Sequence, residues 1–541
     1  MTDTPNSATD THVGLLDAEE HVEKVVLADD DSDAPMSFTV FRKLLAAFVT
    51  FASLLAVAYI VPFPWAQPWR ADEDYIPFWN VIGRELLGQG AAIEADAEKA
   101  EQFDELARRA DEQELEPIKD REVVVTPPAD ELRYPPYEAH ELDPAADELV
   151  VPLDNAEALA PFYASLTLTD IGYEGAITRA GHWGDSVLGN DGITGAIRRR
   201  MQARFGDSGH GFHALKKYDA SYRHQGVQFE EIGSVRWSSC FIRNRCKDDG
   251  HYGYGGVTVW SSGGAQSRFE TATTGAVGLS ASVFEVWYAK RAAGGNLRVT
   301  IDGEVHMVET DLEGAEPGVI EDAWARFPMP DGPHTIDVRA AGGGQARAYG
   351  VILERELPGV VWDEMALIGS FTSRLSAQDP KHLAAQLGHR ELDLMVFTFG
   401  GNDMTREQSD LRKTMDPYIA DYSSVIKLFR EARPQAACLI MGPVDHGERV
   451  GGRVVSRGIV ARMTEAQRQV ATDNGCAFFD TLAAMGGKDA IGRWRSKGLM
   501  SADLAHPSAS GHKVLGTMMY AAVMDGYIAF RKAHEGELIE R

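Results

Sequence analysis

Short apolar runs alternate with amphipathic segments along most of the chain. The runs resemble short buried strands, and they occupy residues 176–180, 359–369, 392–399, 436–441 and 476–480. Patterns of helical periodicity lie among them, at residues 192–205, 417–432, 459–473 and 508–533. Buried strands that alternate with helices are typical of a parallel sheet covered on both faces. The pattern therefore predicts an α/β fold.

A different pattern occupies residues 216–353. This segment is rich in glycine, threonine, valine and aromatic residues, and polar and apolar positions alternate at 284–288, 297–301 and 335–338. Turn signals such as Asp302-Gly303 separate the alternating runs. A period of two with frequent turns indicates β-strands that are buried on one face. The segment is therefore predicted to be an all-β sandwich inserted within the α/β domain.

Near the N-terminus, residues 44–63 form an apolar run without a charged residue. Arg42 and Lys43 precede the run, and Trp65 and Trp69 follow it. About 20 apolar residues span a bilayer, and positive charge marks the cytoplasmic side. We therefore expect a single transmembrane helix in the cytoplasmic membrane, with the C-terminal bulk of the chain in the periplasm or outside. The alternatives are a buried core helix and a cleaved signal peptide.

These patterns divide the chain into consecutive parts. The predicted parts are a disordered acidic cytoplasmic tail at 1–43, the transmembrane helix at 44–63, an acidic stalk or linker at 64–155, an α/β domain at 156–215 and 354–541, and the inserted β-sandwich at 216–353.

Composition supports a folded, acidic protein. The 541 residues are 44% hydrophobic and 25% charged, which is a globular composition, and the formal net charge is −28. Residues 1–150 hold 33 of the 81 acidic residues and 11 of the 53 basic ones, so the acidity belongs to the predicted tail and stalk. A nucleic-acid-binding protein needs a basic surface, and we therefore expect no nucleic-acid partner.

The chain contains four cysteines, too few for a disulfide-dense scaffold. Cys240 and Cys246 are close enough in sequence to close a small loop, and the sequence leaves open whether they are bonded. Cys438 and Cys476 each lie in an apolar run, which predicts buried thiols. Because no CxxC pair occurs, a zinc site on cysteines is not expected.

Three short polar segments follow predicted strands or precede a predicted helix. They are Gly184-Asp185-Ser186, Gly400-Gly401-Asn402-Asp403 and Asp503-Leu504-Ala505-His506. Ligands bind at the carboxyl ends of strands in α/β sheets. A carboxylate three residues before a histidine can hold its Nδ1–H while Nε2 faces a serine nucleophile. Asp445 and His446 also follow a strand end and are weaker candidates for the same cleft.

These segments resemble the conserved blocks of the SGNH hydrolases, or GDSL-like esterases. The resemblance implies a three-layer α/β/α fold and a carboxylic ester hydrolase with the triad Ser186, Asp503 and His506. It also implies an oxyanion hole made by the N–H groups of Ser186 and Gly369 and the side chain of Asn402. Such a mechanism needs no metal and no organic cofactor.

A narrower resemblance points to bacterial envelope proteins. The run 182–186, Asp191, Arg198 and the run 202–212 resemble the peptidoglycan O-acetylesterases, which join an SGNH domain to a carbohydrate-binding-like β-domain. The implied function is a membrane-anchored serine esterase that removes O-acetyl groups from acetylated polysaccharide or peptidoglycan. The resemblance covers about residues 160–535.

Several alternatives stay open at this stage. The same triad could serve an O-acyltransferase, a lipase or a thioesterase, and a non-catalytic glycan-binding protein is a further possibility. Asp191, Trp260 and Trp287 are candidate substrate-binding residues, although aromatic residues of β-sandwiches are more often in the core. The inserted segment lacks every triad residue, so we expect it to act in substrate choice more than in bond cleavage.

Overall fold

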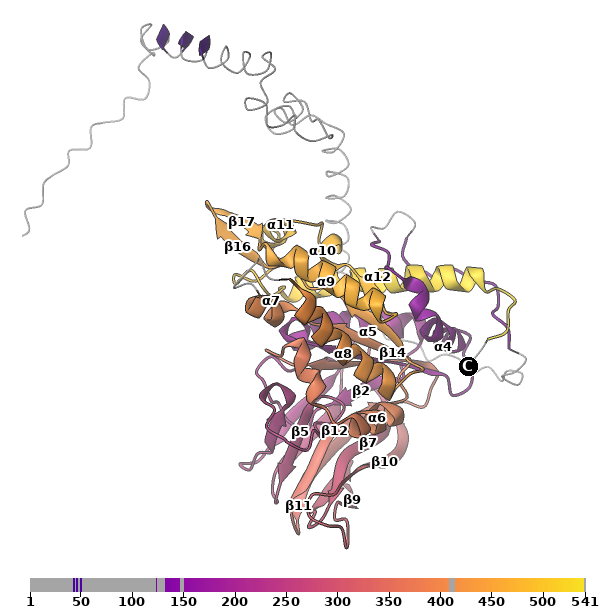
Figure 1. The fold of residues 1–541 in the computed structure, drawn as a ribbon. Coiled ribbons are helices and arrows are strands. Elements are labelled where there is room, and N and C mark those ends of the chain that lie inside the picture. Colours follow the sequence, from indigo (N-terminus) through magenta and orange to yellow (C-terminus); the bar gives the residue numbers. More distant parts are fainter. Residues whose placement is uncertain are drawn as a thin grey trace, which may run out of the picture. The chain divides into compact units, whose positions relative to one another are not determined.

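A parallel sheet forms the centre of the α/β part of the chain in the computed structural model (Figure 1). The structure describes residues 132–145, 150–407 and 414–539, with a few positions between 42 and 50 and at 123. The strand order is β13-β1-β14-β15-β18, and every neighbouring pair is parallel. The strands are β1 (Ile177–Gly184), β13 (Gly359–Ala366), β14 (Leu394–Thr398), β15 (Ala437–Met441) and β18 (Ala477–Phe479).

Helices cover both faces of this sheet. Along β14, Leu394 and Val396 pack into one hydrophobic cluster, whereas Met395 and Phe397 pack into the other. The first cluster includes residues of α4 (Ala160–Asp170), α5 (Gly192–Phe205) and α12 (Ala509–Ala533). The second includes residues of α6 (Pro380–Arg390), α8 (Asp416–Ala432) and α9 (Ile459–Asp473). Successive strand residues point to opposite faces, so the α/β part has three layers.

Shorter helices connect these elements. They are η4 (Ala156–Leu159), η5 (Ser186–Asp191), η6 (Ile242–Asn244), η7 (Thr372–Ala377), α7 (Gly401–Glu407), α10 (Thr481–Ala484) and α11 (Ala490–Ser496).

Local sequence signals explain where two helices begin. The Asp379 carboxylate accepts hydrogen bonds from the backbone N–H groups of Lys381 and His382, and Pro380 occupies the first turn of α6. At α12, the Ser508 hydroxyl accepts a hydrogen bond from the N–H of Gly511. Side-chain caps of this kind satisfy the unpaired N–H groups of a helix start. The Ser508 cap fixes the point where the loop that carries His506 ends.

The inserted segment forms two antiparallel sheets. One has the order β10-β7-β12-β5-β4, with β2 paired to β12, and the other has the order β3-β6-β11-β8-β9. The strands of the segment are β3 (Val227–Ile232), β4 (Ser238–Phe241), β5 (Val257–Ser261), β6 (Gln266–Thr271), β7 (Ala281–Arg291), β8 (Asn296–Ile301), β9 (Glu304–Glu309), β10 (Ile320–Gly332), β11 (Thr335–Gly342) and β12 (Ala346–Glu354), whereas β2 (Gly209–His213) lies just before the predicted start of the segment. A small hairpin, β16 (Gly447–Val450) and β17 (Arg453–Ser456), lies in the α/β part.

One hydrophobic cluster links the two antiparallel sheets to each other and to the α/β part. Val299 of β8 and Val338 of β11 share it with Trp287 of β7. The same cluster continues into Leu387 of α6 and Phe429 of α8. The inserted segment therefore packs against the α6–α8–α9 layer through a continuous apolar core.

The predicted transmembrane helix requires correction. Most of residues 44–63 lie outside the described residues, and among the residues that are described no helix is both long and apolar enough to cross a membrane. Part of the predicted stalk is also packed: Leu132 and Tyr134 are buried in a cluster with Leu168 and Ile539. The division into domains, the cytoplasmic tail and the localisation stay predictions.

The cysteines form two disulfides, Cys240–Cys246 and Cys438–Cys476. The expectation of two buried thiols was wrong, because Cys438 lies in β15 and Cys476 directly precedes β18, the neighbouring strand. Their Cα atoms are 4.6 Å apart, within the usual range for a disulfide. Two apolar runs were recognised as strands, but their adjacency could not be deduced from sequence alone.

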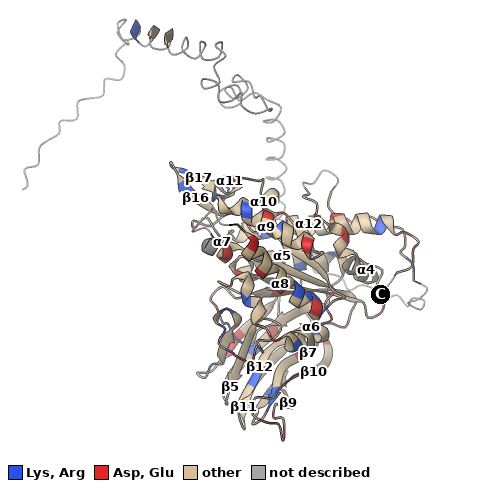
Figure 2. Ribbon diagram, in the orientation of Figure 1, with Lys and Arg blue, Asp and Glu red and all other residues tan. Residues whose placement is uncertain are grey.

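Charged residues of both signs are interspersed over the described helices and strands (Figure 2). This mixture agrees with the nearly balanced charge of the chain beyond residue 150.

Candidate active site

A cleft of about 140 Å³ lies where β1, β14 and β15 end. Its walls come from the segments that follow these strands, from the β17–α9 connection and from the loop before α12. The lining residues are Asp185, Ser186, Val187, Thr398, Phe399, Gly401, Asn402, Thr405, Pro443, Val444, His446, Arg457, Ala505 and His506. The carboxyl ends of parallel strands are the expected ligand site of an open α/β sheet.

Ser186 is the first residue of η5, and Asp185 alone separates it from the end of β1. Gly184 lets the chain turn there, since a Cβ on this residue would lie 2.6 Å from both the Leu188 side chain and the Thr398 carbonyl oxygen. The Ser186 Oγ is 2.9 Å from Nε2 of His506. The hydroxyl and the imidazole are thus within the distance needed for proton transfer.

His506 is held by the residue three positions before it. Its Nδ1 lies 2.7 Å from Oδ2 of Asp503, while Oδ1 accepts hydrogen bonds from the N–H groups of Ala505 and His506 at 3.0 and 3.1 Å. Leu504 adopts a φ of 59°, which closes this tight turn. A carboxylate at Nδ1 fixes the tautomer that leaves Nε2 as the proton acceptor.

The charge of Asp503 is favoured by the same contacts. Partial burial raises the pKa of this carboxyl, but the Ala505 N–H and the His506 ring outweigh it and lower the pKa below its usual value. Asp503 is therefore ionised near neutral pH and can stabilise a positive charge on the imidazole.

Asp185 links two walls of the cleft. Its Oδ1 accepts a hydrogen bond from the N–H of Val187 at 3.0 Å, and its Oδ2 accepts one from the N–H of Gly401 at 3.1 Å. The side chain is buried, which raises its pKa, although these N–H groups oppose that shift. Asp185 therefore connects the turn of Ser186 to the start of α7, where Asn402 lies.

Asn402 lines the cleft, and its Nδ2 donates a hydrogen bond to the Ser370 carbonyl oxygen at 3.1 Å. An amide nitrogen carries two hydrogens, so one donor is not used by this bond. Gly369, the other predicted oxyanion residue, is not among the lining residues of this cleft. Its turn is nevertheless close to the end of β1, because the N–H of Leu367 donates to the Gly184 carbonyl oxygen at 2.7 Å.

Of the two weaker candidates, the structure brings only His446 to the cleft. Burial lowers the pKa of His446 to about 4, so the ring is neutral at pH 7. Asp445 is buried and instead accepts hydrogen bonds from Ser456 and from the N–H of Ile491. Arg457 also lines the cleft, and the sequence analysis missed it because it follows the small β16–β17 hairpin, which no apolar pattern had indicated.

The three candidate substrate-binding residues lie elsewhere. Asp191 is completely buried, pairs with Arg198 and accepts a hydrogen bond from the N–H of Gln225 at 2.7 Å, so it supports the start of α5. Trp287 is also completely buried, in the core of the inserted segment, and offers no face to a sugar ring. Trp260 is partly buried, and Nζ of Lys247 lies 3.8 Å from its ring centroid. The first two residues therefore have structural roles.

Among the residues that the structure describes, no group of three or more histidine, cysteine or acidic side chains is clustered so that it could hold a metal ion.

A family model matches a part of the chain that does not include Ser186. Residues 331–514 match the model of the GDSL-like lipase/acylhydrolase family, a range that includes Gly369, Asn402, Asp503 and His506. No curated protein matches the chain.

A solved structure has a similar fold. The chain is similar to a peptidoglycan O-acetylesterase with a TM-score of 0.56 and 20% sequence identity, over 69% of this chain and 97% of that one. Shorter matches include an acetyl xylan esterase, with 19% identity over 30% of this chain and 80% of that one and a TM-score of 0.23. Another is an acetylxylan esterase from Geobacillus stearothermophilus, with 23% identity over 31% and 73% and a TM-score of 0.23. Residues 331–514 thus form a domain that matches the GDSL-like lipase/acylhydrolase family, which supports an ester hydrolase.

Proposed function

We propose that this chain is a serine esterase that hydrolyses O-acetyl groups on a carbohydrate outside the cytoplasm, with Ser186, His506 and Asp503 as its catalytic triad. The observation that carries the proposal is the continuous set of contacts from Ser186 Oγ to His506 Nε2 and from His506 Nδ1 to Asp503 Oδ2, at 2.9 and 2.7 Å.

In the first half of the reaction His506 Nε2 accepts the proton of the Ser186 hydroxyl as Oγ attacks the ester carbonyl carbon. The tetrahedral intermediate carries an oxyanion, for which the N–H groups of Ser186 and Gly369 and the second Nδ2 hydrogen of Asn402 are the proposed donors. Each such donor is worth roughly 10²–10³ in rate. The intermediate collapses by breaking the bond to the sugar oxygen, which takes the proton from His506 and leaves as an alcohol.

In the second half, water replaces the sugar. His506 accepts a proton from the water as its oxygen attacks the acyl carbon, and the new intermediate releases acetate while Oγ of Ser186 recovers the proton. Asp503 keeps Nδ1 of His506 protonated in both halves. The exposure of the His506 and Asp503 side chains, 44% and 51%, leaves the water a direct approach.

The similarity to a known esterase supports the substrate. The chain has the fold of a peptidoglycan O-acetylesterase over 97% of that protein's length. This likeness favours an acetylated carbohydrate over a lipid or a long-chain thioester.

The disulfides support a location outside the cytoplasm. Disulfides persist in oxidising compartments and are rare in the cytosol. All four cysteines of this chain are bonded.

The decisive experiment measures acetate released by the full-length protein from O-acetylated peptidoglycan, from acetylated xylan and from p-nitrophenyl acetate. We expect hydrolysis of p-nitrophenyl acetate and of at least one polymer, much slower hydrolysis of p-nitrophenyl decanoate, and loss of all activity in Ser186→Ala. The control is Ser424→Ala, an exposed serine of α8. Wild-type turnover in Ser186→Ala would reject the proposed nucleophile, and faster cleavage of the decanoate would reject the short-acyl specificity.

A further inference from the structure

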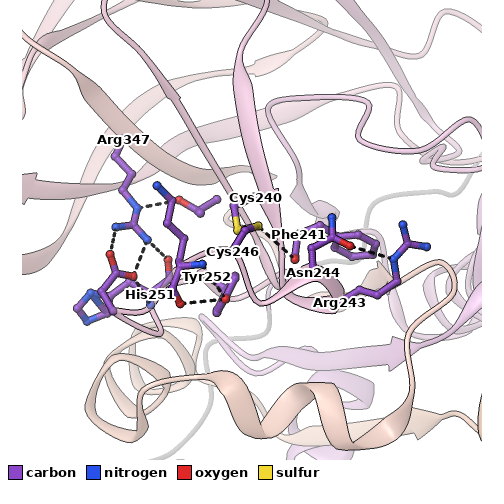
Figure 3. The surroundings of a disulfide bond; sticks show 11 residues. Cys240, Phe241, Arg243, Asn244, Cys246, His251, Tyr252 and Arg347 are labelled. Atoms are coloured by element: carbon purple, nitrogen blue, oxygen red, sulfur yellow. Dashed lines mark hydrogen bonds and ion pairs between the residues drawn. A yellow bond between two sulfur atoms is a disulfide. The ribbon is translucent and has the colours of Figure 1, made fainter.

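A small disulfide-closed loop of the inserted segment reaches the turn that carries Gly369. The Cys240–Cys246 disulfide closes this loop directly after β4, and η6 lies within it (Figure 3). Cys240 is buried in the core of the inserted segment, whereas Cys246 is exposed. The loop is therefore anchored at one end and fixed in conformation by its own covalent bond.

Arg243 extends from this loop to the α/β part. Its Nη1 donates a hydrogen bond to the Ile368 carbonyl oxygen at 2.9 Å. The guanidinium carbon lies 5.2 Å from the centroid of the Phe241 ring, and Nε is 3.4 Å from Oδ1 of Asn244. Neighbours within the same loop therefore hold the guanidinium in place while it binds the carbonyl oxygen.

The hydrogen bond to Ile368 also fixes the direction of the Gly369 N–H. The carbonyl of Ile368 and the N–H of Gly369 belong to one planar peptide group, in which a trans bond makes the two point in opposite directions. Because the carbonyl oxygen faces Arg243, the N–H of Gly369 points away from it. Gly369 has a φ of 71°, a conformation that glycine adopts readily because it has no Cβ. Local steric contacts alone therefore do not fix the orientation of this peptide.

Other contacts hold the flanking peptides of the same turn. The Tyr218 hydroxyl donates to the Ala366 carbonyl oxygen at 2.7 Å, and Asn402 donates to that of Ser370. Asp403 accepts hydrogen bonds from the N–H and the hydroxyl of Thr372 at 3.1 and 3.0 Å. Arg243, in contrast, donates to the carbonyl oxygen of the Ile368–Gly369 peptide itself. A hydrogen bond from a charged donor is stronger than one from a neutral donor.

We propose that Arg243 is a positioning residue that orients and polarises the Ile368–Gly369 peptide so that its N–H can stabilise the oxyanion. This inference rests on the proposed function, which makes the N–H of Gly369 an oxyanion donor. It assigns the inserted segment a part in bond cleavage, beyond the substrate choice expected from the sequence. Arg243 touches no reacting atom and acts through Gly369.

The test compares Arg243→Met, Arg243→Lys and the wild-type full chain on p-nitrophenyl acetate. Methionine keeps an unbranched side chain over Phe241 but cannot donate a hydrogen bond, whereas lysine still can. We expect Arg243→Met to lower kcat by roughly 10- to 100-fold, less than the loss of a complete donor, with KM within about twofold. Arg243→Lys should recover most of kcat. The matched control is Arg298→Met, an exposed arginine of β8.

Two measurements separate this role from a structural one. The Tm of each variant detects partial unfolding, and the split between kcat and KM detects a loss of substrate binding. An unchanged kcat in Arg243→Met, a rise in KM alone, or a fall in kcat that Arg243→Lys shares fully would each overturn the inference. Activity that survives Ser186→Ala would instead reject the proposed function, so the two failures are distinguishable.

Discussion

Ser186 Oγ and His506 Nε2 lie 2.9 Å apart although 320 positions separate these residues in the sequence. The fold achieves this because Ser186 follows β1, near the centre of the sheet, and His506 lies in the loop before the last helix, whose start is fixed by Ser508. The 2.7 Å contact between Asp503 and His506 is local, within one turn. One long-range contact and one short-range contact together make the site.

The local contact gives the first prediction. Asp503→Asn should lower kcat on p-nitrophenyl acetate by roughly 10²–10⁴, because the amide no longer stabilises the imidazolium and favours the wrong tautomer. The half-exposed carboxylate makes the lower part of that range the more reasonable expectation. Steady-state kinetics at pH 7 and a melting curve measure both effects. Full activity in Asp503→Asn would show that another group orients His506.

The second prediction concerns the two disulfides. Mild reduction should open Cys240–Cys246 first, because Cys246 is exposed, whereas Cys438 and Cys476 are both buried. Opening the loop should release Arg243 and lower kcat in the wild type. It should have little further effect in Arg243→Met, in which the contact is already lost. Thiol labelling with mass spectrometry identifies the reduced pair, and equal inhibition of both proteins would contradict the link between the loop and Gly369.

Much of the site could be predicted from the sequence. Short segments at strand ends or before the last helix contain Ser186, Asn402, Asp503 and His506. The cleft is lined by each of these residues except Asp503, which contacts Nδ1 of His506, the ring nitrogen that does not face Ser186. The alternation of apolar runs likewise indicated the parallel sheet. Such signals are local in sequence, and the three-layer arrangement follows from them by general rules.

What could not be predicted depends on contacts between distant segments. Arg243 looks like an ordinary loop arginine until the inserted segment is placed against the turn of Gly369. Trp287 is a residue type that often stacks on sugar rings, and only the packing of both sheets shows that it is buried. Asp191 resembles a residue of the cleft mouth, but its carboxylate faces Arg198 inside the protein.

The third prediction concerns pH and a buried histidine. Burial lowers the pKa of His213 in the folded protein to about 4, with a smaller opposing contribution from the Ala214 carbonyl. The unfolded chain, with an ordinary histidine pKa near 6.5, then binds more protons between about pH 4 and 6.5. The free energy of unfolding should therefore rise with pH in that interval and level off above it.

A variant isolates the contribution of His213. His213 lies among Tyr222, Phe229 and Phe269, at ring centroid distances of 4.8 to 5.4 Å, so phenylalanine should fit the site. Urea unfolding at pH 4.5 and 7 should show a smaller difference in His213→Phe than in the wild type. An equal pH dependence in both proteins would mean that His213 does not contribute.

The fourth prediction separates the two tryptophans of the inserted segment. Trp287→Ala removes a fully buried ring and should destabilise the protein by about 3–5 kcal/mol. Trp260 is only partly buried and contacts Lys247, so Trp260→Ala should unfold near the wild-type temperature. Melting curves measure this difference directly, and equal Tm values for both variants would contradict the assignment of Trp287 to the core.

Activity then decides whether Trp260 binds sugar. Remote contacts orient a large substrate at the reacting centre, and p-nitrophenyl acetate is too small to make them. If Trp260 stacks on a sugar, Trp260→Ala should lower kcat/KM on acetylated polymer and leave p-nitrophenyl acetate hydrolysis unchanged. A matched variant, Lys247→Ala, removes the cation from the ring but leaves the indole, and should retain polymer activity if stacking is the interaction. Equal polymer activity in Trp260→Ala and the wild type would remove Trp260 from the substrate site.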